Sequence, residues 1–546
     1  MTLHSQNKPE YSCRLGEIVA RLRRAGLLES YRMNNSDKTL VSLIPSYTFQ
    51  RIYDQSHDGD LNPATVGVLF YQGVQVDHHQ SLPVMLKGRY QPGVFVGGSS
   101  LAVELMPENT SYIKVSCPRS AWPIAMDVIT GSVQNSLSFI GITGTNGKTS
   151  TTWILHELMR QVKVPHLVIG TFGSCYSLGG EAISLPDFKV TGHTTPDPSI
   201  LFPLLSEAVT YGVRYVIMEV SSHSLMQKKL YGIVFDHVAF TSFSRDHLDI
   251  HGTMDDYFQT KWQLFSAPYS TKNTQQWITQ KLLDSDVFQK CCRKSDVLSK
   301  EGAWDKLQVI NPKKMKNPSH GYSGHFMAEN LSLAAHMASS ILGIDDHNLF
   351  QEMDMTQLRP VPGRMHIIWR QPYVIIDYAH TPDAIGQALG YLKDIYQGYP
   401  LWVVFGCGGM RDQGKRAPMG RVATTLSDRV FLTSDNPRQE DPESIINDIK
   451  GGISPPDMVK VTVILDRREA IRRALREACL MGNSGKKRSQ QVKTNFPVVL
   501  IAGKGHETTQ TIGNKILEFS DQQVALDFFE DQKNHTGQQD ATTNTT

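Results

Sequence analysis

The sequence predicts an α/β protein of three domains, and three observations support this prediction. The chain has 546 residues, more than one hydrophobic core usually supports, so about three domains are expected. Short apolar runs rich in β-branched residues end abruptly at glycine, serine, aspartate or histidine, as buried parallel strands do. Helical patterns lie between several of these runs, which is the alternation found in doubly wound sheets.

The overall composition is that of an ordinary globular protein. Hydrophobic residues make up 40% and charged residues 20% of the chain, and the formal net charge is +2. Such a balance gives no sign of a general affinity for nucleic acid or membrane surfaces. The seven cysteines have no C-x-x-C spacing, which favours a reducing compartment over a disulfide framework or a zinc site. Without a visible secretory signal or membrane-spanning stretch, we expect a cytoplasmic protein, most simply a monomer.

Seven apolar runs are predicted to be buried strands. They lie at residues 137–144, 215–222, 237–243, 373–381, 401–409, 430–436 and 498–505. Helical patterns such as S-I-L-F-P-L-L-S-E-A-V and A-I-G-Q-A-L-G-Y-L-K-D-I-Y separate several of them. Because ligands of such sheets bind beyond the carboxyl ends of the strands, the polar residues that end these runs are the candidates for a functional site.

Breaks in the pattern predict the domain boundaries. Cys117 and Pro118 precede the segment that leads to the first glycine-rich strand, and R-P-V-P-G-R interrupts a later helical pattern. The predicted domains are residues 1–117, 118–357 and 358–546. Two polar segments are predicted to lack regular structure: an exposed loop at residues 481–494, and a disordered tail from about Lys533.

The stretch G-I-T-G-T-N-G-K-T-S-T has the features of a phosphate-binding loop. Gly144 and Gly147 would let backbone N–H groups approach phosphate oxygens, and Lys148 would reach the β- and γ-phosphates. Thr149 would offer its hydroxyl to magnesium at a helix amino terminus. Ile142 stands where the general pattern requires glycine, so the loop is a variant. A glycine–threonine turn without a phosphate partner is the alternative.

Two histidines and two aspartates lie within S-R-D-H-L-D-I-H-G, directly after a predicted strand. This density suggests a metal or phosphate site, although a capped helix start explains it equally well. Magnesium prefers oxygen ligands, so His247 would be a single nitrogen ligand, and Glu219 is the carboxylate best placed to join it. Thr194 and Thr195, in H-T-T-P-D-P, offer hydroxyl groups to an anionic substrate.

Four polar stretches end strands in the last third of the chain. They are D-Y-A-H-T-P-D-A, G-C-G-G-M-R-D-Q-G-K-R, S-D-N-P-R-Q-E-D-P and A-G-K-G-H-E. Arg411 and Arg438 could each bind a carboxylate through two hydrogen bonds, and Glu507 could accept hydrogen bonds from an ammonium group. Any one stretch could be only a polar loop, but the four together suit a zwitterionic amino acid.

Taken in order, these motifs resemble the Mur ligase family, and most closely its MurE type, over about residues 137–510. The resemblance implies an amino-terminal domain for the UDP end of the substrate, a central P-loop ATPase-type α/β domain, and a C-terminal Rossmann-like domain for the amino acid. It implies an ATP-dependent ligase of peptidoglycan precursor synthesis, which adds meso-2,6-diaminopimelate to UDP-N-acetylmuramoyl-L-alanyl-D-glutamate through an acyl phosphate.

The resemblance also assigns residues to the nucleotide, the metal and catalysis. For ATP it implies Gly144, Thr145, Asn146, Gly147, Lys148, Thr149, Ser150, Asn330, Arg364, Asp377, Tyr378 and His380. For Mg²⁺ it implies Thr149, Glu219, His247 and a carbamylated Lys261, and the catalytic set is Lys148, Glu219, His247 and Lys261. By composition alone Lys261 would be a surface lysine. Carbamylation by CO₂ would turn an ammonium of pKa ~10.4 into an anion that can bind magnesium.

For the two organic substrates the resemblance implies further residues. The muramoyl-peptide side comprises Ser56, residues 74–76, Thr194, Thr195, Ser221, Gln227 and Lys229. The diaminopimelate side comprises Arg411, Asp435, Asn436, Pro437, Arg438, Gly503 and Glu507. The D-N-P-R quartet favours diaminopimelate over L-lysine, because Arg438 can pair with a distal carboxylate that lysine lacks.

The chain departs from the family pattern at several positions. Ser242 and Met327 each stand where asparagine is usual, Lys229 replaces arginine, and His366 replaces glutamate; the first 117 residues match only loosely. Three alternatives therefore remain: the same reaction with L-lysine, a ligase similar to folylpolyglutamate synthase, and a non-catalytic Mur-like scaffold. The second should lack D-N-P-R combined with A-G-K-G-H-E, and retention of the phosphate loop argues against the third.

Overall fold

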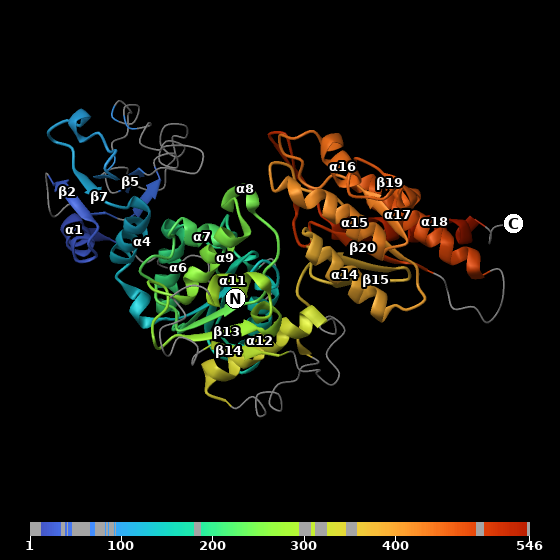
Figure 1. Cartoon of the computed structure of the whole chain (residues 1–546), viewed down its shortest axis with the longest axis horizontal. Coiled ribbons are helices and arrows are strands. Elements are labelled where there is room, and N and C mark those ends of the chain that lie inside the picture. The colour runs from blue at the N-terminus through green and yellow to red at the C-terminus, as the bar shows by residue number, and fades with distance from the viewer. Residues whose placement is uncertain are drawn as a thin grey trace.

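The computed structural model of the chain has three large sheets, each built from one stretch of sequence and arranged in a row (Figure 1). The structure describes residues 12–33, 39–40, 42–45, 66–70, 82, 86, 92, 94–179, 187–293, 307–311, 325–344, 357–486 and 496–542. No helix in these ranges is both long and apolar enough to cross a membrane.

The first sheet has five strands in the order β2-β7-β6-β5-β4. Its strands are β2 (Leu28–Arg32), β4 (Ser42–Pro45), β5 (Val66–Phe70), β6 (Val94–Gly97) and β7 (Tyr112–Val115). All neighbours are parallel except β2 and β7. Helices α1 (Leu15–Arg24) and α4 (Pro118–Ile129) pack against this sheet. Two short strands from the same part of the chain, β1 (Cys13–Arg14) and β3 (Thr39–Leu40), form a separate antiparallel pair.

The second sheet has seven strands in the order β10-β9-β11-β8-β12-β13-β14. Its strands are β8 (Ser138–Thr143), β9 (His166–Gly170), β10 (Gly173–Ser177), β11 (Tyr215–Glu219), β12 (His237–Phe240), β13 (Gln275–Thr279) and β14 (Leu307–Ile310). Only β10 runs antiparallel to its neighbour among these described strands. This parallel arrangement brings the polar carboxyl ends of β8, β11 and β12 to one edge.

Helices cover both faces of the second sheet, which explains why its strands are apolar throughout. Helices α5 (Lys148–Gln161) and α12 (His325–Leu342) pack on the face that contains Ile140 and Ile142 of β8. The other face, with Phe139, packs against α6 (Pro198–Thr210), α7 (Ser222–Met226) and α9 (Met254–Trp262). Further helices in the described part of this region are α8 (Leu248–His251), α10 (Gln280–Leu283) and α11 (Asp286–Arg293).

The third sheet has six strands in the order β15-β16-β20-β17-β18-β19, parallel except for β15. Its strands are β15 (His366–Arg370), β16 (Tyr373–Asp377), β17 (Leu401–Phe405), β18 (Arg429–Leu432), β19 (Val461–Val463) and β20 (Val498–Ala502). One face packs against α14 (Pro382–Ile395), α15 (Arg416–Leu426) and α16 (Pro442–Lys450), and the other against α17 (Arg467–Lys486) and α18 (Asp521–Thr542). A hairpin, β21 (Thr509–Ile512) and β22 (Lys515–Glu518), follows β20.

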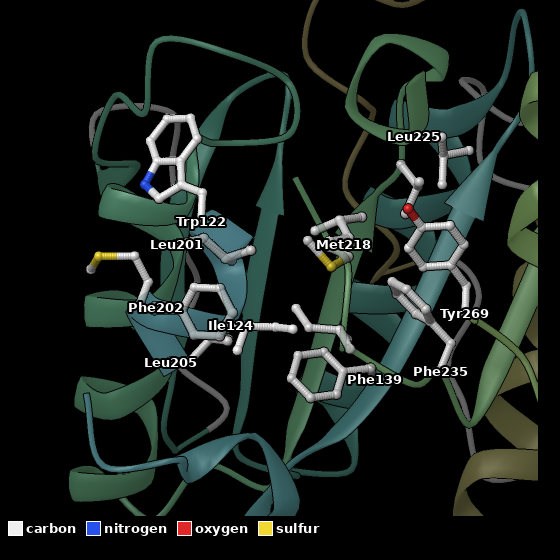
Figure 2. Close-up of a cluster of buried hydrophobic side chains, with 14 of the residues drawn as sticks. Trp122, Ile124, Phe139, Leu201, Phe202, Leu205, Met218, Leu225, Phe235 and Tyr269 are labelled. Carbon is white, nitrogen blue, oxygen red and sulfur yellow. The ribbon is translucent and has the colours of Figure 1, made fainter. Parts of the chain in front are cut away.

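The predicted α/β class and all seven predicted strands are confirmed, and the polar residues of each run lie at or directly after the carboxyl end of its strand. The domain boundaries at 117 and 357 stay a prediction. Around α4 the apolar core is continuous from the first sheet to the second, because its side chains cluster with those of α6 and β8 (Figure 2). The apolar packing is therefore uninterrupted near residue 117.

Helices extend into both segments that were predicted to lack regular structure. Helix α17 continues through Lys486, so the first part of the predicted loop at 481–494 is helical, and α18 continues to Thr542 through most of the predicted tail. Both helices are anchored by buried apolar residues at helical spacing earlier in their length, such as Ala474 and Phe528. Adding residues to a helix that has already formed costs less than starting one, and no proline interrupts either extension.

Candidate functional site

The loop between β8 and α5 has the backbone shape that the sequence predicts for a phosphate loop. Gly144 and Gly147 have φ of +148° and +90°, which favour glycine, and a Cβ at residue 144 would collide with the Thr241 side chain. Helix α5 begins directly after the second glycine, at Lys148. The free backbone N–H groups of this helix start make it suitable for an anion.

Lys148 lies folded over its own loop. Its Nζ donates to the carbonyl oxygens of Gly144, at 2.7 Å, and Thr145, at 3.0 Å. Burial lowers the pKa of Lys148, while the nearby carboxylates of Glu219 and Asp246 oppose that shift. A bound phosphate group would take the place of the two carbonyl oxygens, because an anion compensates a buried ammonium better than carbonyl oxygens do.

Thr149 and Glu219 meet at the carboxyl end of β11. The Thr149 hydroxyl donates to Glu219 Oε2 at 2.9 Å, and Thr171 donates to both carboxylate oxygens through its hydroxyl, at 3.1 Å, and its backbone N–H, at 2.8 Å. Glu219 is buried. Its carboxylate and the Thr149 hydroxyl are the hard oxygen donors that suit Mg²⁺. Thr171 was not predicted, because a lone threonine after a strand gives no sequence signal.

His247 completes this group from the loop after β12. Its φ is +54°, and burial lowers its pKa to about 3, so the ring is neutral and keeps a lone pair. Within the described ranges, no three His, Cys, Asp or Glu side chains converge as a full metal shell. The donors present therefore fit a partial shell, and the remaining ligands of Mg²⁺ would be phosphate oxygens and water.

Lys261 is buried behind the loop, contrary to its ordinary appearance in the sequence. Its side chain is 1% exposed, its Nζ donates to the Gly144 carbonyl oxygen at 2.8 Å, and it lies 4.7 Å from the Tyr257 ring centre. Burial, followed by the positive charge of Lys148, lowers the pKa of Lys261 well below its usual value. Helix α9 thus presents an amine with a strong tendency to be neutral.

A cavity of about 350 Å³, here called the loop cavity, opens above these residues. The predicted residues that line it are Thr145, Asn146, Gly147, Lys148, Thr149, Ser150, Thr194, Glu219, His247, Asn330, Arg364, Asp377, Tyr378, His380 and Arg411. On the side of the cavity that the third sheet forms, the Arg364 guanidinium lies 4.2 Å from the Tyr378 ring centre. Asp377 accepts the backbone N–H of Met365 at 2.7 Å, and burial raises its pKa although Arg364 opposes the shift.

A second cavity, of about 170 Å³ and here called the Arg438 cavity, lies at the carboxyl ends of the third sheet's strands. Of the residues predicted for diaminopimelate, Arg411, Asp435, Asn436, Arg438, Gly503 and Glu507 line it and Pro437 does not. Arg438 has φ of +54° and donates to the Gly409 carbonyl oxygen at 2.8 Å. A Cβ at Gly406 would collide with the Thr433 carbonyl oxygen, so the loop after β17 can approach the loop after β18 this closely only with glycine.

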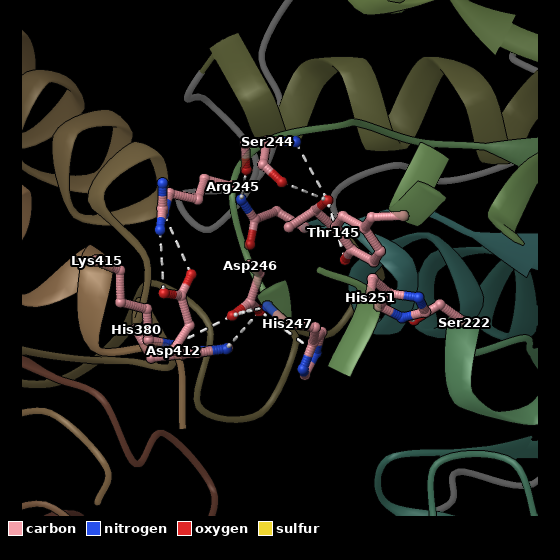
Figure 3. A network of polar contacts seen from close by, with 12 residues as sticks. Thr145, Ser222, Ser244, Arg245, Asp246, His247, His251, His380, Asp412 and Lys415 are labelled. Carbon is pink, nitrogen blue, oxygen red and sulfur yellow. Dashed lines mark hydrogen bonds and ion pairs between the residues drawn. The ribbon is translucent and has the colours of Figure 1, made fainter. Parts of the chain in front are cut away.

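Asp246 connects the two cavities, because it lines both of them. Its carboxylate accepts from Lys415 Nζ at 3.1 Å and lies 3.6 Å from His380 Nε2 (Figure 3). The preceding Arg245 pairs with Asp412 at 3.2 Å. These contacts hold the second sheet's loop against the third sheet. The sequence indicated Asp246 only as part of a dense motif, and Lys415 was not predicted.

Comparison with known proteins decides the family. Residues 142–348 match the model of the Mur ligase middle domain, and residues 363–505 match that of the Mur ligase glutamate ligase domain. The UDP-N-acetylmuramoyl-L-alanyl-D-glutamate--2,6-diaminopimelate ligase of Phocaeicola vulgatus is 34% identical over 84% of this chain and 91% of its own length. The ligase of that name from Coxiella burnetii is 37% identical over 71% of this chain and 78% of its own.

The chain belongs to the Mur ligase family. A solved structure of a ligase with that same name superposes with a TM-score of 0.51 at 28% identity, covering 89% of this chain and 99% of the other. The resemblance to the MurE type and the predicted class, an ATP-dependent ligase of an acid and an amino acid, are confirmed.

Two departures of this Mur ligase from the family pattern have a local explanation. Ser242 Oγ accepts the Asn146 backbone N–H at 3.0 Å and donates to the Asn146 carbonyl oxygen at 2.9 Å, so serine supports the phosphate loop in place of asparagine. Lys229 is 7% exposed and pairs with Asp197 at 2.7 Å. Nothing in the structure explains Met327 or His366.

The residues predicted for the muramoyl-peptide are only partly in the cavities of this Mur ligase. Thr194 lines the loop cavity. Thr195 lies below it, where its hydroxyl donates to the Glu219 carbonyl oxygen at 2.8 Å and accepts the Ser221 backbone N–H at 3.1 Å. Gln227 follows α7 and lines neither cavity. Ser56 and residues 74–76 lie outside the described residues, so their roles stay predictions.

Proposed function

We propose that this Mur ligase adds meso-2,6-diaminopimelate to UDP-N-acetylmuramoyl-L-alanyl-D-glutamate with consumption of ATP, the activity in the names of its relatives. The Arg438 cavity carries this proposal. It presents the cations Arg438 and Arg411 beside the carboxylate of Glu507. A carboxylate and an ammonium on one carbon atom of the amino acid would find opposite charges there, and L-lysine would leave Arg438 without its partner.

The reaction would begin in the loop cavity. The side-chain carboxylate of the D-glutamate attacks the γ-phosphorus of ATP, the bond to ADP breaks, and an acyl phosphate forms. Lys148 and the backbone N–H groups at the start of α5 would bind the phosphate oxygens on which negative charge collects. Thr149, Glu219 and His247 would hold Mg²⁺, which supplies further positive charge at those oxygens.

The second step would take place where the two cavities share Asp246, Tyr378 and His380. The neutral amine of diaminopimelate attacks the acyl carbon, a tetrahedral intermediate forms, and its C–O bond breaks to release phosphate. The amine proton leaves to a nearby acceptor or to water. Residues of both sheets line this place, so the second and third sheets must be held together for the step to occur.

Lys261 would carry a carbamate. A neutral amine attacks CO₂ to form an N–C bond and then loses a proton, and the burial that lowers the pKa of Lys261 favours the neutral form. The resulting anion would lie beside the phosphate loop, where it could join the magnesium shell. Lys261→Ala is expected to abolish activity, and short carboxylic acids to restore part of it. Wild-type turnover in this variant would disprove the carbamate.

The assignment of domains follows from this proposal. Residues 1–117 would bind the UDP end, 118–357 the nucleotide, and 358–546 the amino acid. A cytoplasmic monomer suits precursors made inside the cell, and size-exclusion chromatography with light scattering would test the oligomeric state.

The test of the proposed function is phosphate release from ATP with UDP-N-acetylmuramoyl-L-alanyl-D-glutamate and Mg²⁺, comparing meso-diaminopimelate with L-lysine. We expect release with diaminopimelate only, together with a tripeptide product identified by its mass. Release with lysine at a similar rate would contradict the specificity assigned to Arg438. No release with either amino acid, from folded protein, would favour a non-catalytic scaffold.

A further inference from the structure

Lys504 is a fully buried lysine behind the wall of the Arg438 cavity. Its side chain is 0% exposed, and its Nζ donates to Glu507 Oε2 at 2.8 Å and to Asn436 Oδ1 at 3.3 Å. Both acceptors line the cavity, whereas Lys504 does not. A buried ammonium is costly unless it is paired, so this placement ties Lys504 to these two side chains.

The contacts of Lys504 orient Asn436. The Asn436 Oδ1 atom accepts from Lys504 and from the Thr511 backbone N–H, at 2.9 Å. The Nδ2 group of the same amide must therefore point the other way, and it donates to Glu507 Oε2 at 3.1 Å. The amide cannot be reversed without bringing its NH₂ group against two donors.

Glu507 consequently has two unlike oxygen atoms. Oε2 is occupied by Lys504 and Asn436, while no donor contacts Oε1 among the described residues, and the side chain is 30% exposed. The structure thus leaves one carboxylate oxygen, with its direction set by Lys504, for a ligand in the cavity. That oxygen suits a cationic hydrogen-bond donor such as an ammonium group.

We propose that Lys504 is a positioning residue, which aims Glu507 Oε1 at the ammonium group of the amino acid's non-reacting end. This inference rests on the proposed function. The attacking amine must be neutral, so an ammonium bound by a carboxylate belongs to the other end of the substrate. Lys504 therefore contributes to selecting an amino acid with both an ammonium and a carboxylate at its far end.

The test compares meso-diaminopimelate with (2S)-2-aminopimelate, which keeps the distal carboxylate but lacks the distal amine. The wild-type enzyme is expected to prefer diaminopimelate in kcat/KM by about 10-fold or more, the size of one charged hydrogen bond. In Lys504→Met this preference should fall to about 2-fold because KM for diaminopimelate rises, while KM for ATP changes by less than about 2-fold.

Lys415→Met is the matched control. Lys415 is the other buried lysine at this cavity, but it pairs with Asp246 and does not contact Glu507. The Lys415 variant should lower kcat/KM equally for the two amino acids and leave the ratio between them unchanged. Should Lys504→Met fail to fold, Lys504→Gln removes the charge and retains a polar end, and circular dichroism identifies which variant is native.

Three outcomes separate the explanations. Loss of the preference in the Lys504 variant alone supports the inference. An unchanged preference, or an equal loss with both amino acids, would overturn it and leave Lys504 as a support of the loop. Silence of the wild-type enzyme with both compounds would instead disprove the proposed function.

Discussion

The two cavities are built in opposite ways. In the loop cavity, six consecutive residues from Thr145 to Ser150 form the phosphate-binding side, where one helix start supplies the donors. The Arg438 cavity takes its wall from the segments after β12, β16, β17, β18 and β20, which are far apart in the sequence. Phosphate can be bound by neighbouring backbone N–H groups, whereas an amino acid needs charges of both signs in a fixed arrangement.

This difference decides what holds each cavity in shape. Glycine backbone geometry shapes the loop cavity. The Arg438 cavity depends on buried ions, because Arg467 donates to the carbonyl oxygens of Ser434, at 3.4 Å, and Ala502, at 2.8 Å, directly before two of its loops. Arg467 and its partner Asp521 are both fully buried and 2.7 Å apart.

The largest expected effect is on the loop cavity. Lys148→Met removes the cation that is proposed to reach the γ-phosphate and should lower kcat by about a thousand-fold, as loss of a charge-stabilising group does. Unfolding by urea should be nearly unchanged, since the Lys148 ammonium donates its hydrogen bonds to two carbonyl oxygens of its own loop. Phosphate release measures the rate, and more than a tenth of wild-type turnover would contradict the role.

Breaking the anchor of the Arg438 cavity should affect stability. Arg467→Met leaves Asp521 as a buried, unpaired charge and should lower the free energy of unfolding by about 3 kcal/mol. Urea denaturation measures this. Arg472→Met is the control, since Arg472 joins the same two helices through an exposed pair with Asp531 and should cost less than about 1 kcal/mol. Equal losses would refute the assigned role of Arg467.

A smaller effect is expected from a substitution in the Arg438 cavity, and it should concern one substrate only. Arg438→Lys keeps the charge but loses the planar guanidinium, so kcat/KM for diaminopimelate should fall by about 10- to 100-fold. The KM for ATP should stay the same, because Arg438 lines the Arg438 cavity and not the loop cavity. Initial rates with each substrate varied in turn give both constants. A rise in the KM for ATP would show that the cavities are not separate in function.

The smallest effect concerns pH. Burial, followed by the charges of Arg364 and Lys504, lowers the pKa of His506 to about 3. Between its usual value of about 6.5 and that value, the unfolded chain binds a proton that the folded chain does not, so stability falls as pH falls. The contribution of His506 alone to this loss should be about 1 kcal/mol at pH 5.5 relative to pH 7.5. His506→Gln should reduce this dependence in urea titrations; an identical pH profile would contradict the assignment.

The strands, the phosphate loop and the family can be recognised from the amino-acid sequence alone. Residues 137–144 and the six similar runs are recognisable because helices cover both faces of their sheets, which makes each strand apolar throughout. The phosphate loop is recognisable because a phosphate would be bound by residues that are adjacent in the sequence. The D-N-P-R motif likewise indicates an amino-acid site from four consecutive residues.

The contacts between residues that lie far apart in the sequence, by contrast, become visible only in the folded protein. In the sequence Lys261 resembles a surface residue, but in the fold α9 places its Nζ against the Gly144 carbonyl oxygen. Asp246 lines both cavities, and its carboxylate accepts a hydrogen bond from Lys415, which lies far away in the sequence. Lys504 and Arg467 acquire their roles from partners on other loops and helices. These effects depend on burial and on charges brought together by folding, and local sequence patterns contain neither.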